Sequence, residues 1–406
     1  MMKRRRLFRL PLAAVCLLSL CLSACGDDGI SSGSSPTSSL TQTTSSASLS
    51  TTPPTTAPTL YVDPETGIRY ENRDLQGKKA DYFELPLEGA TGYASVNTPV
   101  YTSADQNSGV LAALQPGEAF TILEEVEGVW WRMETDSVSG WVDNTCCYLN
   151  IPDVVPSIVF DNTNAYSSVF LSSGKDIPDI TGQLLYDSLC RNERYGDERY
   201  VVAANYWMVK KIYAAQQMAL AEGYTLVINE TFRPYDVQLQ VAAQLKQLYT
   251  DDPEVKAGID QRPWGIGWFI ANKLSTHQLG CAMDVSLAKV RSIRYALAGD
   301  YQYAEVTAYE ECAMPTPIHE LSAAAVSMKK PVNSGSATAW IDVEPADTMT
   351  EDALRLKRYC TQAGLSPLAS EWWHFNDLEA KKAIGSNYTT DVFYIHTCRS
   401  RIPEYS

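Results

Sequence analysis

Two short blocks, about ninety residues apart, place the strictest demand on what this chain can fold into. The first runs from Ser275 to Asp284 and contains His277, and the second is Glu371-Trp-Trp-His374-Phe. The chain has four histidines, and half of them stand in these blocks beside a carboxylate. A catalytic zinc ion takes three ligands from imidazole and carboxylate groups and keeps one position open. The blocks therefore predict a fold that gathers His277, Asp284 and His374 around one ion.

The spacing inside the first block requires a bend in the backbone. On one helix His277 and Asp284 would lie roughly 10 Å apart along the axis, too far to share an ion. Gly280 offers the permissive backbone that such a bend needs. Residues 282–287 read as a short strand whose alternation carries Asp284 inward. We therefore expect the ligands to come from a loop and a strand.

Two further charged residues have the chemistry of a hydrolytic site. Glu371 precedes His374 by three residues, so its carboxylate can stand beside an ion without filling the open position. A carboxylate placed in this way can act as a general base, taking a proton from water and returning it to a leaving amine. Arg233 ends a predicted strand that starts at Tyr224, just before a helix that begins at Pro234. Its guanidinium can stabilise an oxyanion or bind a substrate carboxylate.

The combined pattern resembles a known family of bacterial enzymes. The block Ser-x-His-x-x-Gly-x-Ala-x-Asp, the downstream Glu-x-Trp-His and the strand ending in Arg-Pro resemble the zinc D,D-peptidases of cell-wall metabolism. These are the D-alanyl-D-alanine carboxypeptidases and dipeptidases of the hedgehog-like fold, and the resemblance covers about residues 160–400. It implies an α+β domain, Zn²⁺ as cofactor and the following residue roles: metal ligands His277, Asp284 and His374, catalytic base Glu371, transition-state arginine Arg233 and substrate-contacting Ser275.

Two other blocks resemble the dipeptidase branch more than the carboxypeptidases. They are Asp179–Tyr186 and Met314–Glu320. The dipeptidases best known from glycopeptide resistance are cytoplasmic, whereas this chain carries an export signal, so the choice between the two activities and the identity of the terminal D-residue stay open.

We interpret His319 and His396 as loop or packing residues, with His319 in a block that borders the cleft, and Cys281 as a buried thiol rather than a metal ligand.

The first sixty residues predict an exported lipoprotein. Residues 1–24 combine a basic start with an apolar run, which is typical of a signal peptide. Leu-Ser-Ala-Cys25 resembles a bacterial lipobox, in which Cys25 is lipidated and anchors the chain to the outside of the cell membrane. The alternative is an ordinary secretory signal with an incidental cysteine. Residues 25–60 are mostly Ser, Thr and Pro without apolar periodicity, and we expect a disordered tether there.

Residues 86–152 follow a different pattern from the rest of the chain. Short alternating runs between turn signals predict a small all-β barrel. Its Leu-x-Pro-Gly turn, Trp-Trp strand and Gly-Trp-Val strand resemble bacterial SH3-like domains. Docking on peptidoglycan, acting as a spacer and packing against the next domain all remain open as its role, because we expect Trp130, Trp131 and Trp141 largely in the core in every case.

The remaining segments complete the predicted organisation. Residues 61–85 show no recognisable motif and are expected to connect the tether to the barrel. Residues 153–406 suffice for one α+β domain, with helices expected over 201–223, 235–249 and 353–363.

Cleavage of residues 1–24 removes five basic residues and changes the net charge from −15 to about −20, which makes nucleic acid an unsuitable partner. Seven cysteines besides Cys25 would remain in the mature chain, so at least one is unpaired, and their pairing cannot be read from the sequence.

The sequence therefore predicts a zinc D,D-peptidase, tethered to the membrane, that acts on the stem peptides of peptidoglycan. Two alternatives remain, a wall-binding lipoprotein that no longer turns over and a lipoprotein that senses stem peptides. The complete set of three ligands and a base argues against a decayed enzyme.

Overall fold

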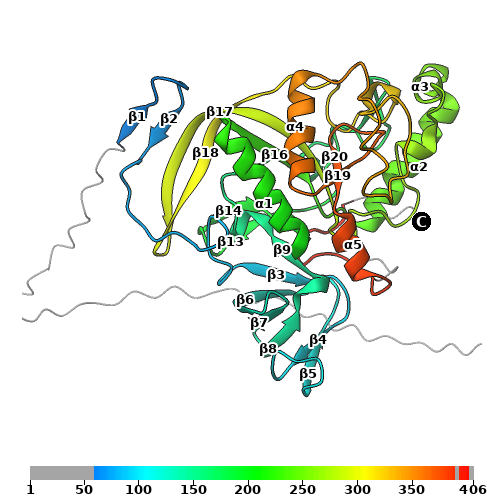
Figure 1. Cartoon of the computed structure of the whole chain (residues 1–406). Coiled ribbons are helices and arrows are strands. Elements are labelled where there is room, and N and C mark those ends of the chain that lie inside the picture. The colour runs from blue at the N-terminus through cyan, green and yellow to red at the C-terminus, as the bar shows by residue number, and fades with distance from the viewer. Residues whose placement is uncertain (1–58, 389–392, 402–406) are drawn as a thin grey trace, which may run out of the picture. The chain divides into compact units, whose positions relative to one another are not determined.

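The computed structural model describes residues 59–388 and 393–401. The predicted signal peptide, Cys25 and nearly all of the predicted tether lie outside the described residues. Within the described part of the chain, no helix is both long and apolar enough to cross a membrane. The described residues fall in one compact unit of mixed α and β structure (Figure 1).

The central sheet is built around one long strand, β17 (Ala282–Ala298). This strand pairs antiparallel with β16 (Tyr224–Glu230), β18 (Tyr301–Glu311) and β20 (His374–Asn376), and parallel with β2 (Arg69–Glu71). The sheet is completed by β1 (Leu60–Val62), β10 (Val159–Phe160) and β19 (Ser366–Pro367). The strand expected over 282–287 is therefore only the first part of a 17-residue strand.

The register of the central sheet brings the sequence blocks together. Asp284, near the start of β17, lies opposite Glu230 of β16 on one side and opposite His374 of β20 on the other. β16 starts at Tyr224, as the sequence predicted, but it ends at Glu230, three residues short of the predicted end at Arg233. Three segments that are far apart in the chain thus meet at one end of the sheet.

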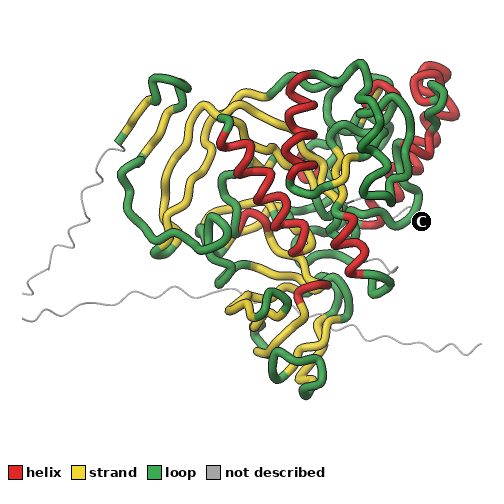
Figure 2. Tube along the Cα trace, viewed as in Figure 1, coloured by secondary structure: helices red, strands yellow, loops and turns green. Residues whose placement is uncertain are grey.

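Helices cover the central sheet and flank the site. α1 (Tyr206–Ala221) packs against β16 and against α4 (Glu351–Gln362), which contacts β17 (Figures 1 and 2). The other helices are α2 (Tyr235–Asp251), α3 (Pro253–Ile259) and α5 (Leu378–Ile384), with short 3-10 turns at Asn144–Cys146, Ile151–Asp153, Thr163–Ala165, Ile266–Trp268 and Ala323–Ala325. The helices expected over 235–249 and 353–363 are confirmed to within two residues at each end.

The helix expected over 201–223 starts later than predicted. Residues Ala203–Asn205 form strand β15 instead, and the helix begins at Tyr206 because the side chain of Asn205 accepts a hydrogen bond from the Trp207 backbone N–H. Asparagine in this position supplies a partner for a free N–H of the first turn, which makes it a good helix start.

An N-terminal sheet contains the strands of the predicted barrel. Its order is β15-β9-β3-β6-β7-β8-β4-β5. The bounds are β3 (Thr91–Ala94), β4 (Thr98–Tyr101), β5 (Val110–Leu114), β6 (Ala119–Val126), β7 (Trp130–Glu134), β8 (Ser139–Asp143) and β9 (Cys147–Asn150). Residues 86–152 are indeed rich in strands, but the edge strand β15 comes from beyond that range. Of the three tryptophans expected in its core, Trp131 is fully buried, whereas Trp130 and Trp141 are partly exposed.

The segment 61–85 is part of the folded body and not a simple connector. β1 and β2 form a hairpin that joins the central sheet. Phe83 and Leu85 are buried, and the carboxylate of Glu84 accepts hydrogen bonds from the backbone and the hydroxyl of Ser157. Two small hairpins lie elsewhere, β11 (Leu171–Ser172) with β12 (Lys175–Asp176) and β13 (Leu189–Asn192) with β14 (Asp197–Tyr200).

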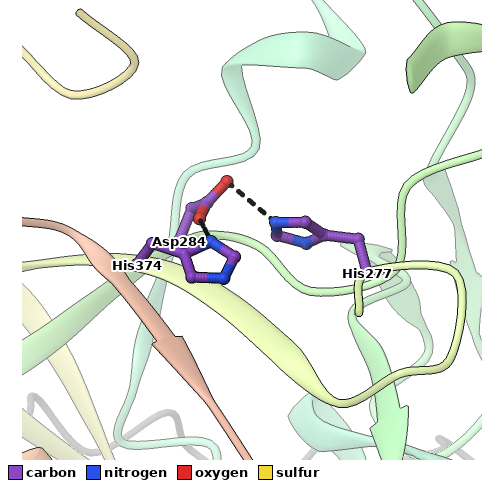
Figure 3. Close-up of side chains that lie close together, drawn as sticks. All are labelled: His277, Asp284 and His374. Atoms are coloured by element: carbon purple, nitrogen blue, oxygen red, sulfur yellow. Dashed lines mark hydrogen bonds and ion pairs between the residues drawn. The ribbon is translucent and has the colours of Figure 1, made fainter. Parts of the chain in front are cut away.

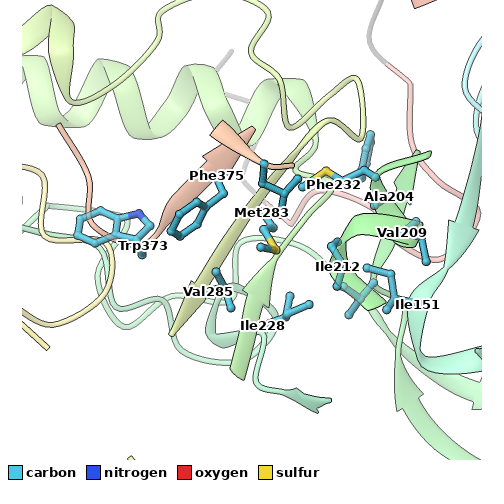
Figure 4. Packing of buried hydrophobic residues seen from close by; sticks show 14 of the residues in the cluster. Ile151, Ala204, Val209, Ile212, Ile228, Phe232, Met283, Val285, Trp373 and Phe375 are labelled. Carbon is cyan, nitrogen blue, oxygen red and sulfur yellow. The ribbon is translucent and has the colours of Figure 1, made fainter. Parts of the chain in front are cut away.

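One hydrophobic core runs through both sheets. Figure 4 shows Ile151 and Ala204, next to the N-terminal sheet, packed near Val209 and Ile212 of α1, with Ile228 of β16 beyond them. The same buried cluster includes Trp131 of β7 and Phe375 of β20. Of the roles left open for residues 86–152, packing against the following domain is therefore observed.

The cysteines of the described residues are all free thiols. Cys281 is fully buried, and burial raises its pKa, as expected for a packing thiol. It belongs to no group of side chains that could hold a metal among the described residues.

Two glycines of the N-terminal sheet give a matched test of how the C-terminal segment is held. Gly117 and Gly128 both have positive φ angles, +85° and +70°. A Cβ at Gly117 would lie 1.9 Å from the carbonyl oxygen of Tyr394, whereas a Cβ at Gly128 would meet nothing within 4 Å. We expect Gly128→Ala to lower the free energy of unfolding by about 1 kcal/mol from the backbone conformation alone, and Gly117→Ala by about 1–3 kcal/mol more from the clash.

Urea unfolding of the two variants beside the wild type measures both losses. Equal losses would show that the segment around Tyr394 does not lie on the turn at Gly117.

Candidate metal centre

The three predicted metal ligands converge in a buried position (Figure 3). His277 lies on the loop before β17, Asp284 lies in β17 and His374 is the first residue of β20. Asp284 Oδ2 lies 3.4 Å from Nε2 of His277, and its Oδ1 lies 2.9 Å from Nδ1 of His374. One potential ligand atom from each residue lies within 4.8 Å of the others. A loop and strands supply the ligands, as the bend at Gly280 predicted.

Each imidazole is oriented by a hydrogen bond on its far nitrogen. Nδ1 of His277 donates to the carbonyl oxygen of Thr231 at 2.7 Å. Nε2 of His374 lies 3.1 Å from the amide oxygen of Asn376, which also accepts from the hydroxyl of Thr276. Such partners fix the tautomer and ring orientation of metal-binding histidines. The remaining nitrogen of each ring therefore turns an electron pair toward the carboxylate of Asp284.

Acceptor atoms that face each other need a cation between them. With their far nitrogens donating, neutral His277 and His374 present lone pairs to a carboxylate, a repulsive arrangement until a proton or a metal ion enters. In a tetrahedral zinc site with bonds of about 2.0–2.1 Å, neighbouring ligand atoms lie roughly 3.3 Å apart. The two nitrogen–oxygen distances, 2.9 and 3.4 Å, run to different oxygens of Asp284, and one potential ligand atom from each residue lies within 4.8 Å of the others. Two imidazoles and one carboxylate in this arrangement could hold a metal ion.

The pKa shifts agree with this description. Burial raises the pKa of Asp284, but the charge and hydrogen bonds of the surrounding histidines outweigh it and hold that pKa well below its usual range. Burial lowers the pKa of His277. For His374 burial also lowers the pKa, but the hydrogen bond and charge of Asp284, together with the charge of Glu371, outweigh burial and raise the pKa. The site therefore offers an ionised carboxylate and attracts a cation, whether a proton or a metal.

Glu371 stands beside the three ligands without joining them. Its Oε2 lies 3.8 Å from Nδ1 of His374, and its side chain is 12% exposed. Burial raises the pKa of Glu371 to about 8, and a cation held at the neighbouring ligands would lower it again. This is the position that the sequence predicted for a general base.

Asp284 also belongs to a second group of possible ligands, with Glu230 and His319. That group already contains a cation. The guanidinium of Arg233 is buried, pairs with Glu230 and lies 2.8 Å from Asp284 Oδ2. Repulsion by the guanidinium disfavours a metal ion there, so His277, Asp284 and His374 form the candidate metal centre.

Arg233 is held rigidly at the predicted site. Its Nη1 donates to Gln238 at 2.7 Å and its Nε donates to Glu230 at 2.6 Å. Glu230 in turn accepts from the hydroxyl of Tyr186 and from the amide of Asn164. The block Asp179–Tyr186 was singled out in the sequence analysis. Its last residue, Tyr186, contacts the site through this hydrogen bond to Glu230.

Two residues of this network were not recognised in the sequence. His319, interpreted as a loop or packing residue, is fully buried, with its Nε2 3.1 Å from Asp284 Oδ2 and its ring stacked on Phe170 at 4.2 Å. The block around His319 was expected to border the cleft, which His319 does line, but nothing in the local pattern signals its contact with Asp284. Glu230 had a usable signal, because it is a carboxylate at the end of an apolar strand, three residues before Arg233. His396, in contrast, is exposed.

The three candidate ligands line a cleft of about 560 Å³, together with Arg233, His319 and Glu371. Ser275 borders it, although its N–H and hydroxyl both donate to the side chain of Gln278, at 2.7 and 2.9 Å. Among the described residues that line the cleft, the only acids are Asp284 and Glu371. Basic and aromatic groups are also present, including the exposed Lys273 and Lys381 and the ring of Trp268.

Replacement of one histidine at a time separates the two groups of ligands. We expect His374→Ala to abolish the tight binding of one zinc ion, because it removes a ligand. His319→Ala should keep one zinc per chain, because His319 contacts Asp284 from the side occupied by Arg233. Metal content after dialysis against a weak chelator measures both, and loss of zinc in His319→Ala with retention in His374→Ala would reverse the assignment.

Comparisons with known proteins add no relative to this description. No protein-family model matches the chain, and a search of curated proteins finds no match. The family resemblance therefore rests on the sequence blocks alone and stays a prediction.

Proposed function

We propose that the protein is a zinc-dependent D,D-peptidase that removes the last residue from N-acylated peptides ending in two D-amino acids. Stem peptides of peptidoglycan are the substrates of this chemistry outside the membrane, where the predicted lipid anchor at Cys25 would hold the enzyme. The observation that carries the proposal is the convergence of His277, Asp284 and His374 with Glu371 in one cleft. A hedgehog-like fold for the catalytic part and an SH3-like fold for residues 86–152 belong to the same proposal.

The residues of the cleft divide the work of hydrolysis. Zinc, when bound by the three ligands, lowers the pKa of a water molecule and polarises a carbonyl group. The carboxylate of Glu371 takes one proton from the attacking water as its oxygen adds to the carbonyl carbon. The same carboxyl group then gives that proton to the amine nitrogen as the C–N bond breaks. General acid–base catalysis of this type contributes about 10²–10⁴-fold to a rate.

Arg233 is suited to a substrate contact at the same centre. Its side chain lines the cleft, and Glu230 and Gln238 fix the plane of its guanidinium. Burial lowers the pKa of Arg233, but Glu230 and Asp284 outweigh this effect and raise it, so it stays charged. A fixed cation costs no reorganisation when negative charge develops on a carbonyl oxygen, which is the usual basis of oxyanion stabilisation.

The charges of the cleft favour an acylated substrate over a free dipeptide. In a free dipeptide the ammonium group lies two bonds from the carbonyl carbon that is attacked, and so close to Arg233 and the metal. Of the described residues that line the cleft, Asp284 and Glu371 alone are acidic, and both already have roles. Two like charges about 5 Å apart repel by about 3 kcal/mol at an effective dielectric constant of about 20. An amide nitrogen carries no such charge.

Glu371→Gln tests the role of the base. We expect one zinc per chain as in the wild type, because Glu371 is not a ligand, and a loss of kcat of at least about 10²-fold, because the proton acceptor is gone. The matched control is Glu379→Gln, which changes an exposed glutamate of α5 that pairs with Lys211. Zinc content and turnover of a muropeptide ending in D-Ala-D-Ala, followed by mass spectrometry, measure the two effects. Unchanged turnover in Glu371→Gln would remove the proposed base.

A pair of substrates tests the choice of acylated peptide. N-acetyl-D-Ala-D-Ala and free D-Ala-D-Ala differ at one nitrogen, which carries an acetyl group and no charge in the first peptide and a positive charge in the second. We expect kcat/KM to be at least about a hundredfold higher for the acylated peptide, from the repulsion given above. Equal values would make the protein a dipeptidase as much as a carboxypeptidase.

The same turnover assays test the alternative that the protein binds stem peptides without hydrolysing them. If neither peptide nor the muropeptide yields a product that depends on Glu371, the peptidase proposal is wrong. Tight binding of the muropeptide without hydrolysis would then identify a stem-peptide sensor.

A further inference from the structure

The loop that carries His277 lies directly on the edge of the N-terminal sheet. The backbone oxygen of Gln278, the next residue, accepts a hydrogen bond of 2.6 Å from the hydroxyl of Tyr148 in β9. The backbone oxygen of Gly280 accepts one of 2.8 Å from the N–H of Asn205 in β15. Tyr148, Asn205 and Gln278 are all buried, so no bulk water competes for these bonds. Two carbonyl groups of the metal loop are thus tied to the N-terminal sheet.

The loop and the sheet approach each other so closely at Gly280 that a side chain there would clash. Gly280 has a φ angle of +62°, and a Cβ there would lie 2.6 Å from the ring of Tyr148 and 2.8 Å from the backbone nitrogen of Asn205. The glycine therefore serves two needs, the bend between the ligands and the close approach to the sheet. A shift of the Tyr148 ring would be transmitted to the loop by direct contact.

A second connection reaches His277 from its other side. The carbonyl oxygen of Thr231 orients the imidazole of His277, and the hydroxyl of the same threonine donates to the carbonyl oxygen of Ala203 at 2.8 Å. Ala203 is the first residue of β15, which pairs with β9. The N-terminal sheet is therefore bonded to the His277 loop at two places. It holds the backbone beside His277, and it holds Thr231, which orients the imidazole ring.

We propose that Tyr148 is a positioning residue of the metal centre, through which the N-terminal sheet holds the His277 loop ready to bind the ion. The proposal rests on the metal site of the proposed function and not on its substrate. Metal-binding geometry tolerates displacements of only about 0.5 Å. Loss of groups that orient the ligands typically weakens metal binding by about 10–100-fold.

Tyr148→Phe removes the hydroxyl and keeps the ring. We expect the dissociation constant for zinc to rise about tenfold, because the loop loses one of its two ties to the sheet. In the metal-free protein, the backbone N–H groups of residues 276–281 should exchange with deuterium faster than in the wild type. Zinc titration with a competing chelator and hydrogen exchange measured by mass spectrometry give the two readouts, neither of which requires turnover.

Tyr93→Phe is the matched control. Tyr93 lies opposite Tyr148 in the register of β3 and β9 and is also buried. Burial raises the pKa of its hydroxyl, as do the charges of Cys398, Asp153 and Cys190, none of which belongs to the metal loop. We expect zinc affinity and loop exchange in Tyr93→Phe to equal those of the wild type, although its stability can fall.

The outcomes separate this proposal from the enzymatic one. Unchanged zinc affinity and loop exchange in Tyr148→Phe, or equal changes in both variants, would overturn the positioning role. If Tyr148→Phe does not fold, Thr231→Val, which breaks the other connection, should weaken zinc binding in the same direction, and wild-type affinity in that variant would overturn the proposal. If the wild type binds no zinc, the metal centre fails, and loop exchange still decides whether Tyr148 holds the loop.

Discussion

The buried carboxylate of Asp284 is the constraint on which the rest of the site depends. It faces His277, His319 and His374, and its Oδ2 is also paired with Arg233. A buried charge is costly unless it is surrounded by partners of this type. The partners come from different elements, so the fold must align those elements before the charge can be accommodated. The register of β16, β17 and β20 achieves this by placing Asp284 opposite both Glu230 and His374.

The sequence predicted which side chains converge better than it predicted the fold around them. His277, Asp284 and His374, with Glu371 and Arg233 beside them, were singled out because their residue types and spacing carry chemical information that does not depend on long-range packing. The helix at 235–249 was found because its pattern is local. The start of α1 was misplaced because Ala203–Asn205 pair with β9, some fifty residues earlier, and this pairing overrides the local preference for helix. His319 was missed for a related reason, since its contact with Asp284 spans 35 residues and has no periodic signature.

The network around Arg233 creates two neighbouring positions for a cation, and the residues around each position differ. Asp284 is shared, but Glu230 and Gln238 hold the guanidinium on one side while two imidazoles leave the other side for an ion. A guanidinium cannot lose its charge at any ordinary pH, so its position is permanently filled. The candidate metal centre therefore has no second open cation position at the shared carboxylate beside it.

The order of strands in the N-terminal sheet has a consequence for how the molecule can be assembled and divided. β15 lies at the edge of that sheet next to β9, yet it is made more than fifty residues after β9 and immediately before α1. Until β15 pairs with β9 during folding, β9 has an unpaired edge to which strands of other molecules can add. Residues 86–152 are thus not a module that evolution or a protein engineer could move intact to another enzyme. A cut at residue 152 would separate β9 from the neighbour that covers it.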